Sequence, residues 1–295
     1  MTELVQQIRS GDPRALARAA TLVEERAGWD LLRDLFPHSG RAAIVGVTGA
    51  PGSGKSTLVD QLTREWRARG STAGIIAVDP SSPYTGGAIL GDRIRMQSHH
   101  GDPGVFIRSM ASRGRLGGLA PATHDMALLL DAAGRDVVLN ETVGVGQAEV
   151  DIARLADVTV VVLVPGMGDD VQALKAGLME IASVVAINKS DLPGAGKLEL
   201  EIRQQLSLGG QETPILSTVA TEGKGTAALV DAITACRAAH AQPGRIVERW
   251  RLRLSEMLRE RLLDRFDQRQ LEAAAREVAE RRRDPYSIVE EWLRQ

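Results

Sequence analysis

The chain has 295 residues, of which 43% are hydrophobic and 25% are charged, and its formal net charge is −2 at pH 7. This length allows one sizeable α/β domain with helical additions, and the near-neutral charge gives no reason to expect nucleic acid as the main ligand. A single cysteine, Cys236, excludes an internal disulfide and a cysteine metal cage. The longest apolar run, residues 158–164, is too short to cross a membrane, and the first residues lack the pattern of a signal peptide. We therefore expect a cytoplasmic protein with no membrane partner.

Residues 1–38 are predicted to form an N-terminal helical segment. The sequence Ser-Gly-Asp-Pro at residues 10–13 predicts a break between two amphipathic helices. Apolar residues fall at helical spacing on both sides of this break: Leu4, Val5, Ile8, Leu16, Ala19, Ala20 and Val23.

Residues 39–240 alternate between short apolar runs and helical patterns. The apolar runs lie at residues 44–47, 75–78, 137–139, 158–164, 184–187 and 215–216. Helical patterns follow near residues 57–69, 121–134, 170–181, 197–206 and 226–239. Near-continuous apolar strands separated by helices indicate an α/β fold with a mostly parallel central sheet that is flanked by helices.

A complete phosphate-binding loop follows the first predicted strand. Its pattern is G-x-x-x-x-G-K-[ST], and a strand at residues 41–48 and a helix at residues 57–69 give it the required setting. The glycines let backbone N–H groups turn towards phosphate oxygens, and the helix N-terminus adds a partial positive charge. We expect Lys55 to reach the β- and γ-phosphates and Ser56 to ligate Mg²⁺. The candidate nucleotide-binding residues here are Gly49, Ala50, Pro51, Gly52, Ser53, Gly54, Lys55, Ser56 and Thr57.

Two aspartates follow in a proline- and glycine-rich stretch after the second predicted strand. Asp79 and Asp92 are plausible Mg²⁺-shell ligands, because a hard cation that keeps several waters suits oxygen ligands on such a segment. Either carboxylate could instead cap a turn or a helix.

The sequence E-T-V-G-V-G-Q at residues 141–147 follows another predicted strand. Glu141 stands at the carboxyl end of that strand, where open α/β sheets gather ligands, and could hold Mg²⁺ directly or through water. Gly144 is placed so that its N–H can contact the γ-phosphate. Gln147 is a candidate for positioning the attacking water, although a solvent-facing loop amide is an equally good interpretation.

An apolar strand at residues 184–187 ends in Asn188-Lys189-Ser190-Asp191. The carboxylate of Asp191 can accept hydrogen bonds from N1–H and the 2-amino group of guanine, and adenine has no such donor pair. An unpaired buried carboxylate would reject ATP, so the pattern favours GTP. The loop after the next strand should complete the base pocket with backbone groups of Val219, Ala220 and Thr221.

Residues 241–295 are predicted to form a C-terminal helical arm. Residues 245–295 contain no glycine and carry many charges. An apolar stripe runs through its first part: Val247, Trp250, Leu254, Met257, Leu258 and Leu262. The arm could pack on its own domain, dimerise or dock a partner.

Several motifs together resemble one family. The segments that carry the resemblance are residues 49–57, V-D-P-S-S-P at 78–83, G-D-R-I-R-M at 91–96, R-G-R-L-G-G-L at 113–119, E-T-V-G-V-G-Q at 141–147, P-G-M-G-D-D-V-Q at 165–172 and N-K-S-D at 188–191. They resemble the MeaB/ArgK group of P-loop GTPases, which are associated with methylmalonyl-CoA mutase and include the methylmalonic aciduria type A protein. The resemblance is good over about residues 1–240 and weaker beyond residue 244.

The resemblance implies a chaperone that binds and hydrolyses GTP, gates adenosylcobalamin loading and protects an acyl-CoA mutase such as methylmalonyl-CoA mutase. It implies a homodimer whose weak intrinsic GTPase activity is stimulated by the mutase. Residues 39–240 would then be the GTPase domain, and residues 241–295 the dimerisation arm.

The implied ligands are GTP or GDP and Mg²⁺. Carried over residue by residue, the metal-shell residues are Ser56, Asp79, Asp92 and Glu141. The guanine-binding residues are Asn188, Lys189 and Asp191. The candidate catalytic residues are Lys55, Glu141 and Gln147.

The segment at residues 166–177 matches an additional switch of the family that reports the nucleotide state to the mutase. Two positions depart from the family pattern. Asn140 replaces an apolar strand residue and could tune the metal site, and Val219 replaces a serine, which leaves the base contacts there to the backbone.

Two other functions are compatible with parts of the pattern. A metallochaperone-type GTPase of the nickel kind predicts Cys and His ligands near the switches, which this sequence lacks. An amino-acid-transport-linked ATPase or kinase would need an acceptor pocket and preferably adenine recognition, and the N-K-S-D pattern argues against the latter.

Overall fold

The computed structural model divides the chain into two compact units, residues 1–242 and residues 243–295. Each unit is described by itself. The residues that the structure describes are 2–79, 96–99, 101–111, 121–142, 148–166, 172–208, 212–263, 265–266 and 268–294.

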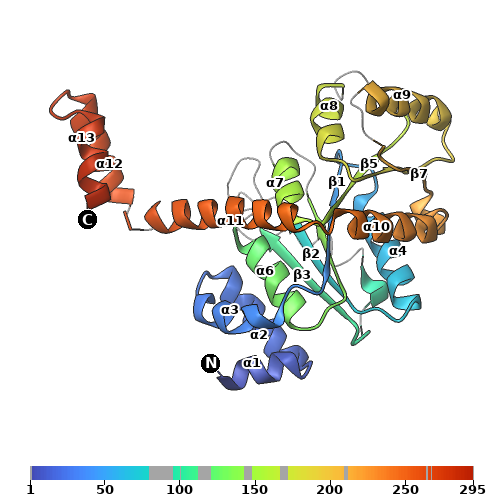
Figure 1. Ribbon diagram of the computed structural model, residues 1–295, viewed down its shortest axis with the longest axis horizontal. Coiled ribbons are helices and arrows are strands. Elements are labelled where there is room, and N and C mark those ends of the chain that lie inside the picture. The colour runs from blue at the N-terminus through green and yellow to red at the C-terminus, as the bar shows by residue number, and fades with distance from the viewer. Residues whose placement is uncertain are drawn as a thin grey trace. The chain divides into compact units, whose positions relative to one another are not determined.

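A seven-stranded parallel sheet forms the centre of the first unit (Figure 1). Its strands are β1 (Ala43–Thr48), β2 (Ala73–Asp79), β3 (Val105–Ala111), β4 (Val137–Glu141), β5 (Val158–Leu163), β6 (Val184–Ile187) and β7 (Ile215–Ser217), in the spatial order β3-β2-β4-β1-β5-β6-β7. Every residue of β4, β5 and β6 is buried, as expected for strands that are covered on both faces. The α/β fold predicted from the alternating pattern is confirmed.

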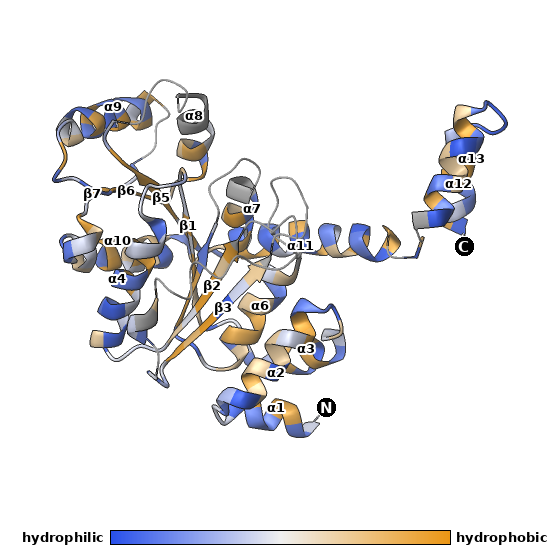
Figure 2. Ribbon diagram, turned by 180° about the vertical axis from the view of Figure 1, so that it is seen from behind, coloured by the Kyte–Doolittle hydropathy of each residue, from blue (hydrophilic) through white to orange (hydrophobic). Residues whose placement is uncertain are grey.

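Helices cover both faces of this sheet. One face packs against α4 (Lys55–Ala68) and α10 (Thr226–His240), and the other packs against α6 (Pro121–Ala132) and α7 (Ala148–Leu155). Towards β6 and β7, α8 (Gln172–Ile181) and α9 (Ala195–Leu208) close a third apolar cluster. In Figure 2 the apolar colour gathers on β2, β3 and α6, in the interior of the unit.

Three helices precede the sheet: α1 (Thr2–Arg9), α2 (Pro13–Glu24) and α3 (Trp29–Leu35). Asp12 caps α2 by accepting hydrogen bonds from the N–H groups of Arg14 and Ala15, at 2.8 and 3.3 Å. Their apolar residues belong to the same core cluster as α6, so these helices extend the core of the first unit. The sequence predicted two helices in this segment, and the third, α3, is a short seven-residue helix that buries Leu31 and Leu35.

The linker into β1 is tied to the end of α6. The carboxylate of Asp131 accepts hydrogen bonds from the backbone N–H groups of Gly40, Arg41 and Ala42. Because these residues directly precede β1, the C-terminal end of α6 lies at the amino edge of the sheet. Helix α6 therefore runs antiparallel to the strands that it covers.

The second unit consists of α11 (Pro243–Leu263), α12 (Gln268–Ala279) and α13 (Pro285–Arg294). Helices α12 and α13 lie side by side (Figure 1). Phe266 stacks on Trp292 with ring centroids 4.7 Å apart, and Arg283 pairs with Glu291 at 2.6 Å. The helical character predicted for this part of the chain is correct. Among the described residues, no helix combines the length and the apolar character needed to span a membrane.

Candidate nucleotide-binding site

The loop between β1 and α4 adopts backbone conformations that favour glycine. Gly49, Gly52 and Gly54 have φ values of +144°, +77° and +88°. A Cβ atom at Gly49 would lie 2.3 Å from the carbonyl oxygen of Val162, and one at Gly54 would lie 2.4 Å from Nδ2 of Asn188. The loop therefore passes so close to β5 and to Asn188 that side chains at these two glycines are excluded.

Lys55 begins α4, and its side chain is only 6% exposed. Its Nζ donates hydrogen bonds to the carbonyl oxygens of Gly49 and Ala50, at 2.8 and 3.1 Å. These bonds hold the ammonium group inside the loop, beside the N-terminus of α4. A buried cation next to a helix N-terminus is suited to bind a phosphate group.

Ser56 and Glu141 meet across the sheet end. The Ser56 hydroxyl donates to Oε1 of Glu141 at 2.6 Å, and both side chains are buried. Ser56 belongs to the first turn of α4 and Glu141 ends β4, so the contact brings together two sequence-predicted residues that are 85 positions apart. A hydroxyl and a carboxylate beside a phosphate loop form an oxygen donor set that fits Mg²⁺.

Among the described residues, no group of three or more His, Cys, Asp and Glu side chains could hold a metal ion by itself. Mg²⁺ is usually held by one or two protein carboxylates together with phosphate oxygens and water. Ser56 and Glu141 would supply the protein ligands in the described part of such a site.

Asn188 joins the phosphate loop to the predicted base pocket. Its Nδ2 donates to the carbonyl oxygen of Ser53 at 2.9 Å. Its Oδ1 accepts from the backbone N–H of Ala220 at 3.1 Å and from the Thr218 hydroxyl at 3.3 Å. Lys189 adds a second link, because its Nζ donates to the carbonyl oxygen of Gly52 at 2.9 Å. Three segments that are distant in sequence are thus held together at one end of the sheet.

Asp191 is exposed, whereas sequence reasoning treated the carboxylate as buried. It belongs to the loop after β6, and a stacked base would be needed to remove it from water. The hydrogen bond to Glu222 raises the pKa of Lys224, and the charge of Asp191 adds a smaller contribution. Val219 and Lys224 form an isolated antiparallel bridge, in which the Val219 N–H donates to the Lys224 carbonyl oxygen at 3.1 Å.

The remaining predicted residues divide into two groups. Pro51 and Thr57 lie in the loop and in the first turn of α4, and Thr221 lies in a short 3₁₀ helix at Ala220–Glu222. Asp79 ends β2, and its side chain lies outside the described residues. The same is true of three further predicted residues, Asp92, Gly144 and Gln147. Residues 167–171 of the predicted additional switch also lie outside the described residues.

Asn140 was predicted to tune the metal site, and the strand geometry excludes only a direct contact with the metal ion. Side chains alternate along a strand, and its neighbours Val137 and Leu139 pack on the α4 side while Val138 packs on the α6 side. Asn140 therefore projects to the face opposite to Glu141 and cannot contact a metal ion held by Ser56 and Glu141.

Two polar contacts near the site were not anticipated. The Thr142 hydroxyl donates to the Thr48 hydroxyl at 3.0 Å and joins the ends of β4 and β1. Asp60, one turn after Ser56, accepts from the Ser98 hydroxyl at 2.5 Å and lies 3.1 Å from Nε2 of His99. No sequence motif marks these contacts, because each depends on residues that only the folded sheet brings together.

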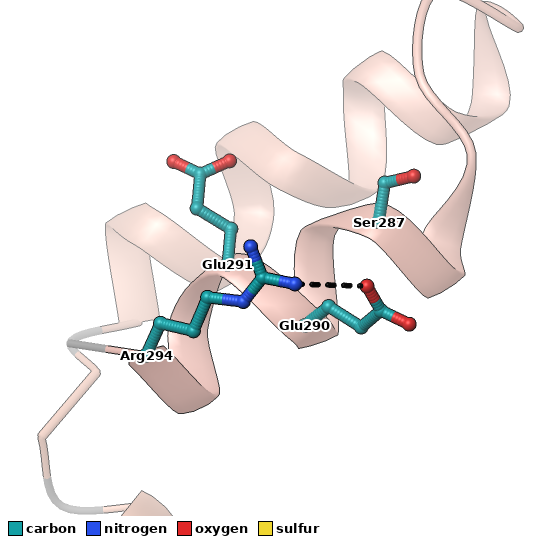
Figure 3. Close-up of a pocket in the computed structure, with 4 residues that line it drawn as sticks. All are labelled: Ser287, Glu290, Glu291 and Arg294. Atoms are coloured by element: carbon teal, nitrogen blue, oxygen red, sulfur yellow. Dashed lines mark ion pairs between the residues drawn. The ribbon is translucent and has the colours of Figure 1, made fainter.

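The depression in Figure 3 lies elsewhere. Ser287, Glu290, Glu291 and Arg294 line it, and all four come from α13. Arg294 and Glu290 pair at 3.6 Å, with side chains that are 81% and 71% exposed. Such a solvated pair cannot desolvate a ligand, so this depression is not a candidate site.

The parallel sheet, the glycine-rich loop that opens α4 and the Asn188 network define a P-loop nucleoside triphosphatase. A family model described as "Methylmalonyl Co-A mutase-associated GTPase MeaB" matches residues 16–275, and the chain belongs to this family of GTPases. It is 47% identical to a putative GTPase of Pyrococcus abyssi, across 99% of this chain and 96% of that protein. It is 43% identical to the GTPase ArgK of Escherichia coli, across 65% of this chain and 60% of that protein.

A solved structure titled as a LAO/AO transport system kinase has a similar fold. The TM-score is 0.68 and the identity is 26%, and the match covers 99% of this chain and 96% of that one. The predicted family and the predicted GTPase class are confirmed by these comparisons.

Proposed function

We propose that this GTPase is a nucleotide-operated chaperone of an adenosylcobalamin-dependent acyl-CoA mutase, such as methylmalonyl-CoA mutase or a close relative. Its bound nucleotide would gate the loading of adenosylcobalamin and protect the mutase. The observation that carries this proposal is the family match over residues 16–275, since the family's description states an association with methylmalonyl-CoA mutase.

The geometry supports a GTPase whose parts respond together to the nucleotide. Asn188 contacts both the phosphate loop and Ala220, and Ser56 contacts Glu141. A change at the phosphates therefore has direct hydrogen-bonded routes to the base loop and to β4. Conformational output from such a site is what a regulatory GTPase requires.

In this proposal Lys55 binds the β- and γ-phosphates, and Ser56 and Glu141 hold Mg²⁺. When bound, Mg²⁺ would neutralise developing charge on the phosphate oxygens. Asp79 and Asp92 are proposed for the metal shell, Gly144 for the γ-phosphate and Gln147 for the attacking water. Asn188, Lys189 and Asp191 would bind guanine, with backbone groups of Val219, Ala220 and Thr221 completing the pocket.

The second unit is proposed to be the dimerisation arm. Its helix α11 exposes large apolar side chains that recur about every four residues: Ile246, Val247, Trp250, Leu254 and Leu258. Such a stripe is typical of a helix that packs against another helix. Deleting residues 243–295 should convert a dimer into monomers, which sedimentation velocity can measure. A shortened chain that still sediments as a dimer would exclude the arm as the dimer contact.

A kinase linked to amino-acid transport is the competing function, because the structure with a TM-score of 0.68 carries a kinase title. A kinase of this kind would be expected to use ATP. The exposed Asp191 beside Lys224 instead offers a carboxylate to a base with two adjacent N–H donors, which adenine lacks.

The deciding experiment measures GTP hydrolysis by the purified full chain with Mg²⁺, alone and with an adenosylcobalamin-dependent acyl-CoA mutase. We expect the mutase to accelerate hydrolysis and to co-elute with the GTPase in gel filtration. An unchanged rate together with no association would exclude the chaperone role. Competition of ATP for the bound nucleotide, with transfer of phosphate to an amino-acid transport protein, would favour the kinase.

A further inference from the structure

The layer between the sheet and α6 contains a polar group that the nucleotide site does not use. Most of this layer is apolar, and it includes Ile76, Val138 and Met126. Asn140 and Thr123 are nevertheless fully buried, at 0% exposure each. Within the part of the chain that the structure describes, the Asn140 amide nitrogen, the Asn140 amide oxygen and the Thr123 hydroxyl all lack a hydrogen-bond partner.

Strand register places Asn140 in this layer. It lies opposite Gly46 on one side and Ile76 on the other. A Cβ atom at Gly46 would meet Cγ1 of Ile152, which belongs to α7, at 2.5 Å, so this face of the strands points towards α6 and α7.

Measured along the strand direction, Thr123 of α6 lies at nearly the same level as Asn140 of β4. A Cβ at Gly74 would meet Leu130 of α6 at 2.8 Å, and Gly74 pairs with Val138 of β4. Thr123 precedes Leu130 by two turns, about 10 Å of helix, and Asn140 follows Val138 by about 7 Å of strand. Because α6 runs antiparallel to β4, both displacements lead towards the carboxyl edge of the sheet. The two polar side chains are thus about one residue step apart in height.

An amide and a hydroxyl that are buried without partners would each destabilise the fold by about 1 to 3 kcal/mol. Buried water resolves this cost when it can make two to four hydrogen bonds to such groups. We propose that Asn140 and Thr123 bind buried water between β4 and α6. The Asn140 amide supplies both donors and an acceptor, which suits water better than a cation, because N–H groups would repel a positive charge.

The hydration site has a consequence for the nucleotide site. Asn140 is followed by Glu141, whose carboxylate contacts Ser56 on the opposite face of β4. Water that bridges Asn140 to the first turn of α6 would hold the carboxyl end of β4 in place from the face opposite to Glu141. Asn140 is then a positioning residue, and this inference does not depend on which partner protein the GTPase serves.

A double-mutant cycle on the full chain tests the shared water. Thr123→Val should lower the midpoint of thermal unfolding by about 2 to 6 °C in the wild-type background, because the water loses one partner. In the Asn140→Leu background, where the water has lost its principal partner, the same substitution should change the midpoint by less than about 1 °C. Equal shifts in the two backgrounds would overturn the proposal.

Thr63→Val is the matched control. Thr63 is also fully buried, but its hydroxyl donates to the Val59 carbonyl oxygen at 2.7 Å within α4. Its effect should be the same with Asn140 or Leu at position 140.

If either variant fails to fold, a crystal structure of the wild-type chain gives a second test. An ordered water within hydrogen-bond distance of the Asn140 amide and the Thr123 hydroxyl is expected. A protein group in that place, or no density beside either side chain, would refute the site.

Discussion

The two ends of the parallel sheet both carry polar side chains, but they use them differently. At the amino edge, Arg67 of α4 donates to both carboxylate oxygens of Asp102, at 2.8 and 2.9 Å, and also to the Ser71 carbonyl oxygen. At the carboxyl edge, Lys55 donates to carbonyl oxygens of its own loop, and Asp191 is exposed. Helix α4 thus has a cation near each end: Lys55 is bound by backbone carbonyl oxygens, and Arg67 is bound by a carboxylate.

The difference separates stability from binding. The guanidinium–carboxylate contact at the amino edge is bidentate and joins α4 to the turn before β3, so it holds the fold. Loop carbonyls are weaker partners for an ammonium group than phosphate oxygens are, so the Lys55 contacts can yield to a ligand. Substitutions at the carboxyl edge should therefore act on nucleotide binding, and those at the amino edge on unfolding.

Lys55→Ala should have the largest effect, because it removes a buried cation from the phosphate loop. We expect the affinity for GDP and for a non-hydrolysable GTP analogue to fall at least about 100-fold. Isothermal titration calorimetry in the presence of Mg²⁺ measures this loss. The thermal midpoint without nucleotide is the control for folding, and retained tight binding would contradict the phosphate role of Lys55.

Asp191→Asn should reduce the preference for guanine roughly 10- to 100-fold, since an amide cannot accept both guanine donors. A competition assay between GTP and ATP, or between GTP and xanthosine triphosphate, gives the selectivity ratio. Glu222→Gln is the matched control, because it changes a neighbouring carboxylate that is paired with Lys224 at 2.6 Å. Equal selectivity in wild type and Asp191→Asn would remove Asp191 from the base pocket.

Glu141→Gln should weaken the Mg²⁺ dependence of nucleotide binding. The amide keeps a hydrogen-bond contact to Ser56 but loses the charge that attracts the metal ion. We expect the Mg²⁺ concentration needed for half-maximal GTP hydrolysis to rise about 10-fold, while GDP affinity without Mg²⁺ changes little. An unchanged Mg²⁺ titration would show that Glu141 serves the fold rather than the metal.

Arg67→Met should have the smallest effect on binding and a moderate effect on stability, about 1 kcal/mol at pH 7. The hydrogen bonds from Arg67 hold the pKa of Asp102 below its ordinary value. The contribution is therefore present above the ordinary aspartate pKa, about 3.9, and is lost as the pH falls through the lowered folded-state pKa. Urea unfolding at several pH values should show the difference between wild type and variant shrinking at acid pH.

The exposed pair of Arg33 and Asp30 provides the control for this measurement. Its side chains are 74% and 64% exposed, so Arg33→Met should leave stability nearly unchanged at every pH. If Arg67→Met lowered the free energy of unfolding by the same amount at every pH, packing of the Arg67 side chain rather than its ion pair would stabilise this edge.

Local patterns in the sequence predicted six strands of the sheet and most of its covering helices, but they missed the strand β3 and the helix α7. They also marked both nucleotide motifs. Gly49 to Ser56 and Asn188 to Asp191 are recognisable because each chemistry is contained in a few consecutive residues. The placement of Glu141 at the ligand-binding end of the sheet followed from the rule that parallel strands gather ligands at their carboxyl ends, and the structure adds its contact with Ser56.

Features that depend on packing between distant elements were not predictable in this way. The side of β4 from which Asn140 projects depends on strand register, and its burial beside Thr123 depends on how α6 crosses the sheet. The exposure of Asp191 depends on how the loops after β6 and β7 lie. None of these properties has a local signature in the chain.

The close approach of Gly54 to Asn188 limits how the two nucleotide motifs can change. A methyl group at position 54 would overlap the Asn188 amide, which lies 2.4 Å from the place of that atom. A larger residue at 54 would thus require a smaller one at 188, and the link between Asn188 and the Ser53 carbonyl, 135 positions away, would be lost with it. Positions 54 and 188 are therefore coupled, and an enlarged residue at position 54 would have to be designed together with a change at position 188.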